Sequence, residues 1–154
     1  MKHILILLFV VHSLSLFAQN TNSETYDSTL ARKLGADDYG MKMYTLVILK
    51  SGQNTGLNKA HRDSCFKIHM ENIVKMKNDG KLFVAGPFGK NELNYRGIFI
   101  LNVSTIEEAR ELVGADAAVV EGYLEAEYLP WYGSAALGEY LPAAEKVTKK
   151  SIVR

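Results

Sequence analysis

The feature that most constrains the fold is a repeated change in the spacing of apolar residues. Strands show a two-residue period or a short apolar run, whereas helices repeat their apolar residues every three to four positions. Strand patterns cover residues 43–49, 82–86, 97–103 and 122–131, and helical patterns cover residues 59–79 and the segment after 104. This strand, helix, strand, strand, helix, strand order predicts an α+β, ferredoxin-like fold with a four-stranded antiparallel sheet.

The two predicted helices carry clear local signals. On the first, Cys65, His69, Ile73 and Met76 fall on one stripe, and Gly80 ends the helix. Before the second, Ser104-Thr105-Ile106-Glu107 is typical of a capping box, in which the Ser104 hydroxyl accepts from the amide three residues on. Residues 116–120 are expected to form another short turn.

Two helices on one face of such a sheet leave the other face uncovered. That face is expected to be at least half apolar, and such surfaces are usually buried against a partner. The usual cover is a second copy of the same sheet, so we expect a homodimer that pairs through the sheet face.

The N-terminus has the three parts of a secretory signal peptide. A basic head at Lys2 precedes an apolar run over residues 4–11 and the small residue Ala18. The run is shorter than the roughly 20 apolar residues that a membrane span requires. We therefore expect residues 1–18 to be removed and the protein to be exported, to the periplasm or beyond, with no membrane attachment. A buried N-terminal strand or an uncleaved anchor are the alternatives.

The remaining chain divides by composition. Residues 19–40 are expected to form a polar N-terminal arm with a short helical turn around residues 28–34, residues 41–132 the folded domain, and residues 133–154 a C-terminal extension with a basic end. We see no internal repeat.

The charge and the cysteine content of the chain argue against several classes of function and of site. A net charge of +1 gives no field that would attract nucleic acid. The single cysteine, Cys65, allows neither an internal disulfide nor a cysteine-rich metal site, and it is either buried or a thiol free to pair between chains. No metal-ligand, phosphate-loop or serine-hydrolase motif is present, so no metal or cofactor is expected.

His69 is the residue with the clearest chemical potential. It lies on the apolar stripe, where a titratable ring needs a partner. Asp116, just after the second helix, is a candidate partner. The alternatives are a core histidine bonded to a backbone carbonyl and an aspartate that caps the following turn. Cys65 lies four residues before His69, so a thiolate–imidazole pair is a further option.

Several short motifs occur in a specific order between about Met43 and Trp131, and together they resemble the YciI-like (YCII-related) family. They are His69 with Gly80, Leu82-Phe83-Val84-Ala85-Gly86-Pro87, Arg96-Gly97-Ile98, Ser104-x-x-Glu107-Glu108-Ala109, Asp116-x-x-Val119-x-x-Gly122, and Pro130-Trp131.

The resemblance implies a ferredoxin-like fold that pairs into a dimeric α+β barrel. It also implies that His69 and Asp116 face a shared pocket as an acid/base pair. Relatives include a dehydrochlorinase of chlorinated hydroxyquinols, and the wider superfamily includes muconolactone isomerases, so a small aromatic or lactone-like ligand is expected. The sequence departs from the family at Ala117, where proline usually follows the aspartate, and in its export signal.

The substrate site is expected to include further residues beside the pair. Aromatic side chains would form a wall of the site, although they could instead pack in the core or in the dimer contact. Arg96 would hold an anionic group, although it could instead be a solvated residue of the hairpin. The expected substrate-binding residues are Gly86, Pro87, Phe88, Tyr95, Arg96 and Trp131.

Three functions are consistent with these features. The first is a lyase or isomerase in which His69, oriented by Asp116, moves a proton at a carbon next to a carbonyl or hydroxyl. The second is a dimer that binds a small ligand without turnover. The third is an interaction domain that uses the free sheet face for another protein.

Overall fold

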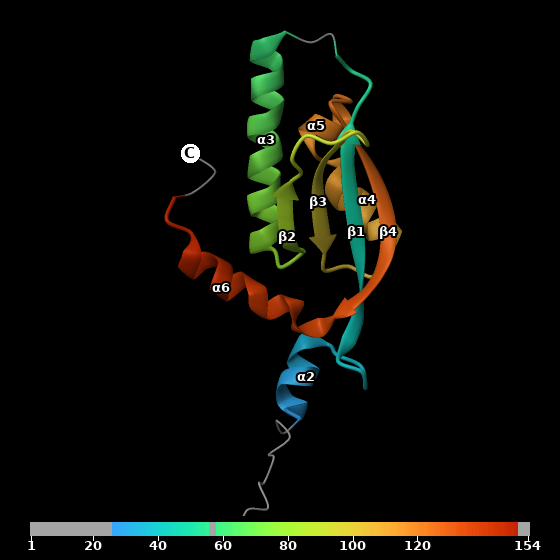
Figure 1. Cartoon of the computed structure of the whole chain (residues 1–154), viewed down its shortest axis with the longest axis vertical. Helices are drawn as coiled ribbons and strands as arrows, with labels where there is room; N and C mark the ends of the chain where they lie inside the picture. The colour runs from blue at the N-terminus through green and yellow to red at the C-terminus, as the bar shows by residue number, and fades with distance from the viewer. Residues whose placement is uncertain (1–25, 56–57, 151–154) are drawn as a thin grey trace, which may run out of the picture.

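The computed structural model describes residues 26–55 and 58–150, and the predicted signal peptide lies outside them (Figure 1). In chain order the elements are α2 (Ser28–Leu34), β1 (Met41–Ser51), α3 (Lys59–Asn78), β2 (Leu82–Pro87), β3 (Tyr95–Leu101), α4 (Ile106–Gly114), α5 (Ala117–Val120), β4 (Leu124–Ser134), the 3₁₀ helix η2 (Ala135–Glu139) and α6 (Tyr140–Val147).

The sheet confirms the predicted α+β class. Its four strands lie in the order β2-β3-β1-β4, and every neighbouring pair is antiparallel. The two outermost strands are therefore β2 and β4, and each helical crossover skips one strand. This order is compatible with a ferredoxin-like fold.

The two faces of the sheet differ in burial, because successive side chains of a strand point to opposite faces. Val47 is paired with Phe99, and both are buried against the helices. The neighbouring pair, Leu46 and Ile100, points to the opposite face and is half-buried. We name this opposite side the open face. It carries Leu46, Ile48, Ile98, Ile100, Leu129 and Trp131.

The core lies between the sheet and α3, α4 and α5. On α3 the predicted stripe is buried at Cys65, His69 and Met76. On α4, Ala109 and Val113 are fully buried. The helical period therefore predicted the correct face of α3. Asp79 caps α3, and Gly80 follows with a φ of 68°, a left-handed conformation that glycine adopts at little cost.

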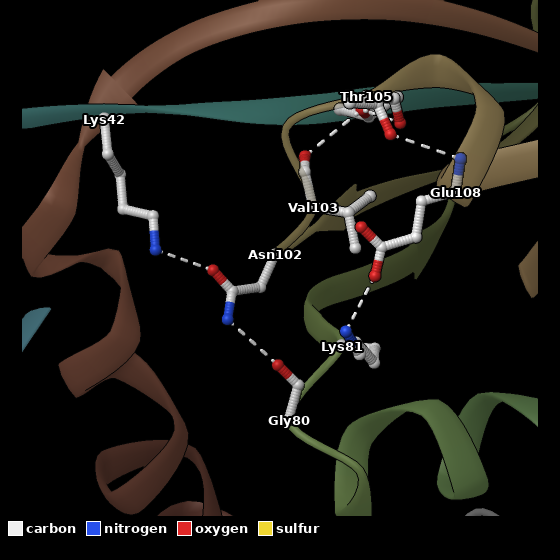
Figure 2. Close-up of polar contacts among 8 residues, drawn as sticks. Lys42, Gly80, Lys81, Asn102, Val103, Thr105 and Glu108 are labelled. Atoms are coloured by element: carbon white, nitrogen blue, oxygen red, sulfur yellow. Dashed lines mark hydrogen bonds and ion pairs between the residues drawn. The ribbon is translucent and has the colours of Figure 1, made fainter. Parts of the chain in front are cut away.

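The cap of α4 differs from the prediction by one residue. Thr105, rather than Ser104, is the N-cap, and its hydroxyl accepts from the Glu108 amide at 3.3 Å (Figure 2). The expected return bond of a capping box is replaced by an ion pair, because the Glu108 carboxylate meets Lys81 at 2.7 Å. This pair ties α4 to the residue just before β2.

A second polar link closes the same end of the sheet. Asn102 accepts from the Lys42 ammonium at 2.7 Å and donates to the Gly80 carbonyl at 3.0 Å (Figure 2). The Thr45 hydroxyl, buried in β1, donates to the Val103 carbonyl at 3.2 Å. The chain after β3 is thus held against β1 and against the end of α3.

The C-terminal extension contains structure that the sequence analysis missed. The final strand continues to Ser134, and η2 and α6 follow it. Pro142 lies in the first turn of α6, where a missing backbone donor is tolerated. Lys77 on α3 and Glu145 on α6 form an ion pair at 2.9 Å, so α6 lies beside the end of α3 (Figure 1).

Within residues 26–55 and 58–150, no helix is both long enough and apolar enough to cross a bilayer.

Candidate functional site

His69 and Asp116 meet in the core. The His69 Nδ1 atom lies 2.8 Å from Oδ2 of Asp116, within direct hydrogen-bond distance. The His69 side chain is 10% exposed and the Asp116 side chain 1%. The carboxylate thus holds Nδ1 of a nearly buried imidazole, and among the described residues no backbone carbonyl takes this role.

Asp116 also caps α5, which confirms the second interpretation of this residue. Its Oδ1 atom accepts from the Ala118 amide at 2.9 Å. Its Oδ2 atom accepts from the Asn72 amide group at 3.3 Å in addition to His69. The helix start fixes one carboxylate oxygen, and α3 engages the other. Capping and pairing with His69 are therefore compatible.

The hydrogen bonds decide the charge of Asp116. Burial works against ionisation, but the contacts with His69, Ala118 and Asn72 outweigh it and lower the pKa of the Asp116 carboxyl from its usual 3.8. The group is therefore ionised at neutral pH. An ionised carboxylate that accepts from Nδ1 selects the tautomer in which Nε2 is the nitrogen free to exchange a proton.

Aromatic rings fix the plane of the imidazole. Phe99, from the central strand β3, stacks on His69 with a centroid distance of 6.1 Å. Phe66, one turn earlier on α3, meets it edge-on at 5.9 Å. Because α3, β3 and α5 all constrain the ring, its orientation depends on three elements of the fold.

His69 lines a cavity of about 370 Å³ between α3 and the sheet. This lies within the range of about 300–1,000 Å³ found for small-ligand pockets. The lining residues are apolar apart from His69 and Arg96. The other lining residues are Leu49, Phe66, Met70, Ile73, Ala85, Gly86, Pro87, Gly97, Phe99 and Leu124.

Arg96 is the cationic residue among those that line the cavity. It lies at the start of β3, where the register with β1 shifts between Leu49 and Lys50. Within the described part of the chain its guanidinium forms neither an ion pair nor a hydrogen bond. Arg96 is therefore available to an anionic ligand.

Gly97 allows β2 and β3 to lie close together in the cavity wall beside Arg96. A Cβ atom at Gly97 would lie 3.0 Å from the Gly86 carbonyl oxygen on the neighbouring strand. A side chain at this position would therefore require a shift of a few tenths of an ångström between the two strands. Gly86 and Pro87 line the cavity with it, so three of the expected substrate-binding residues, counting Arg96, are together with His69.

The three expected aromatic residues lie elsewhere. Trp131 is on the open face, packed on Tyr44 at 5.5 Å and over Gly133, whose Cβ would lie 2.4 Å from the indole. Phe88, just after β2, and Tyr95, the first residue of β3, pair with each other at 6.1 Å. None of them lines the cavity, which is instead lined by Phe66 and Phe99.

Cys65 is buried, with 4% of its surface exposed. Burial raises the pKa of its thiol, which opposes formation of a thiolate beside His69. Among the described residues, no group of three His, Cys, Asp or Glu side chains is arranged to hold a metal ion.

Three residues around His69 were not predicted as site residues from the sequence, namely Asn72, Phe66 and Phe99. A signal for Asn72 was present, because a residue three positions after His69 shares its face of the helix. The role of Phe99 depends on strand register, which the sequence does not state.

Comparisons of the chain with protein-family models and with curated proteins find no match.

Proposed function

We propose that this protein is a small-molecule lyase or isomerase in which His69 and Asp116 act as an acid/base pair. The observation that carries the proposal is the 2.8 Å contact between Nδ1 of His69 and Asp116 at the wall of an apolar cavity. Because His69 lines this cavity, a ligand bound there would contact its ring.

The chemistry is a proton transfer at carbon. With Nδ1 bound to Asp116, Nε2 takes a proton from a carbon next to a carbonyl and returns it to another atom of the ligand. Asp116 keeps the ring in one tautomer and stabilises the imidazolium that forms. Such a positioned group typically contributes about 10²–10⁴-fold to a rate.

We further propose that the chain is an exported, YciI-like protein and that two copies pair through their open faces into an α+β barrel. The signal-like N-terminus and the ordered motifs between Met43 and Trp131 support the first part. Half-buried apolar side chains on the open face support the second, because water contact with such a surface is unfavourable.

The test couples ligand binding to proton exchange. Small phenols and lactones that raise the melting temperature are selected first and then incubated with the protein in D₂O. NMR should show deuterium entering the ligand next to its carbonyl with the wild type, and a rate at least 100-fold lower with His69→Gln. His61→Gln is the matched control, because His61 is an exposed histidine of the same helix.

Exchange at the wild-type rate in His69→Gln would contradict the proposal. Ligand binding with no exchange in the wild type would assign the cavity to binding alone. If the protein is a monomer and binds no small ligand, the result would favour an interaction domain that uses the open face for another protein.

A further inference from the structure

A second groove continues the cavity along the same seam of the fold. On α3 the cavity extends from Phe66 to Ile73, and the groove extends from Met70 to Lys77. On β2 the cavity takes residues 85–87, and the groove takes Leu82, Phe83 and Ala85. Met70, Ile73 and Ala85 line both spaces, so the two follow each other along one helix and one strand.

Helix α6 covers the second part of this seam. The groove has a volume of about 490 Å³, and its outer wall includes Tyr140, Leu141 and Ala144 of α6. The ion pair between Lys77 and Glu145 joins α3 and α6 at the last of the groove's α3 residues. Figure 1 shows α6 crossing beside the C-terminal end of α3.

The two ends of the seam differ in charge. Arg96 at the cavity end has no ion-pair partner among the described residues, whereas Lys77 at the other end is neutralised by Glu145. The other lining side chains are apolar, apart from His69 beside the Arg96 end and Tyr140 and Thr148 beside the Lys77 end. The seam therefore offers one available cation at one end of a long apolar surface.

From this arrangement we propose that the ligand is a linear, medium- to long-chain carboxylic acid. The carboxylate pairs with Arg96, whose planar guanidinium can bind both oxygens. The alkyl chain passes His69, continues past Met70, Ile73 and Ala85, and ends under α6. This inference rests on the proposed function, since it names the substrate class of the same site.

A compact aromatic acid would leave the second groove empty. A linear chain fills both spaces and gains affinity with length, because each buried methylene contributes about 0.8 kcal/mol, or about fourfold in Kd. Met70 at the junction can adjust its flexible side chain to the ligand.

The inference is tested by calorimetric titration of the whole chain with hexanoate, decanoate and tetradecanoate, each below its micelle concentration. Kd should fall about threefold or more per methylene, and the matching alcohols should bind at least tenfold more weakly. A Kd that stops falling at hexanoate, or that is equal for acids and alcohols, would overturn it.

Variants at the two ends of the seam test separately the binding of the ligand's carboxylate and of its alkyl chain. Arg96→Gln should weaken acids at least tenfold and leave alcohols unchanged. Lys90→Gln, an exposed cation outside the cavity, is its control. Equal losses for acids and alcohols in Arg96→Gln would contradict the placement of the carboxylate.

At the tail end, Ala144→Phe should weaken tetradecanoate at least tenfold and leave hexanoate unchanged. Ala143→Phe is the control, because Ala143 is exposed on the same helix and does not line the groove. If Ala144→Phe does not fold, Thr148→Phe places the same obstruction at the next turn. Equal effects on all chain lengths would overturn the inference.

These titrations are independent of turnover. Chain-length dependence in a protein without His69-dependent exchange would support the ligand class and reject the proposed reaction. His69-dependent exchange on short lactones, without a chain-length dependence of acid binding, would support the proposed reaction and reject the ligand class.

Discussion

Asp116 combines a structural and a chemical role in one side chain. One oxygen begins α5 through the Ala118 amide, and the other accepts from His69 and Asn72. Because both oxygens are occupied, the carboxylate cannot rotate without losing a bond. The start of a four-residue helix therefore fixes the orientation of the imidazole.

Substitution of Asp116 should change stability in a pH-dependent way. Its folded pKa lies below its unfolded value of 3.8, so the ionised group stabilises the protein above that value. The stabilisation is lost as the pH falls through the folded pKa. At pH 7, Asp116→Asn should lower the free energy of unfolding by about 2 kcal/mol, and this difference should shrink below pH 3.8.

Urea unfolding of both proteins between pH 2.5 and 7 measures this difference. Asp63→Asn serves as the control, because Asp63 is an exposed carboxylate paired with Lys59 and should contribute at most about 0.5 kcal/mol. A pH-independent difference for Asp116→Asn would show that the carboxyl is not ionised in the folded protein.

Cys65 should be unreactive in the folded protein. Burial both raises its thiol pKa and blocks access, so a disulfide reagent at pH 7 should modify it at least tenfold more slowly than in denaturant. The matched control carries Cys65→Ala with Ser64→Cys, which moves the thiol to an exposed neighbouring position. Rapid modification of native Cys65 would revive the possibility of a disulfide between chains.

Among the elements, α4 shows how local pattern and final structure can differ by one residue. Ser104 and Thr105 are both good caps, and the sequence offers each a glutamate three residues later. Thr105 takes the role where its carbonyl also lies near β1, sharing the Thr45 hydroxyl at 3.4 Å with the closer Val103 carbonyl. The position of β1 therefore selects between two equivalent local choices.

Removal of each hydroxyl should separate the two choices. Thr105→Ala should lower the free energy of unfolding by about 1 kcal/mol, since it leaves the Glu108 amide without its acceptor. Ser104→Ala should change it by less than about 0.5 kcal/mol. Thermal unfolding measures both, and equal losses would indicate that Ser104 also caps the helix.

For the molecule as a whole, the open face is expected to set the oligomeric state. If two copies pair there, Leu129→Lys should convert a dimer to a monomer, because it places a charge within the apolar contact, on the outermost strand β4. Sedimentation velocity of wild type and variant measures this. Val120→Lys, at an exposed apolar residue of α5, should leave the mass unchanged. A monomeric wild type would contradict the proposed dimer.

Local pattern alone was sufficient for the order of the elements, the buried stripe of α3 and the cap at Asp116. These depend on spacing within a short segment, where apolar period and capping chemistry act over a few residues. The cavity also required Gly86, Pro87 and Arg96 to meet His69. These three were predicted as substrate-binding residues, although residues far apart in the chain supply the cavity.

The remaining features depended on how the strands align. Register put Trp131 on the open face and Phe99 under His69, and a one-residue shift would exchange the two faces. Docking decided the place of α6, whose pattern is too short to specify what it covers. Periodicity predicts which side of a helix or strand is apolar. Only tertiary packing decides whether that side contacts another element, a cavity or solvent.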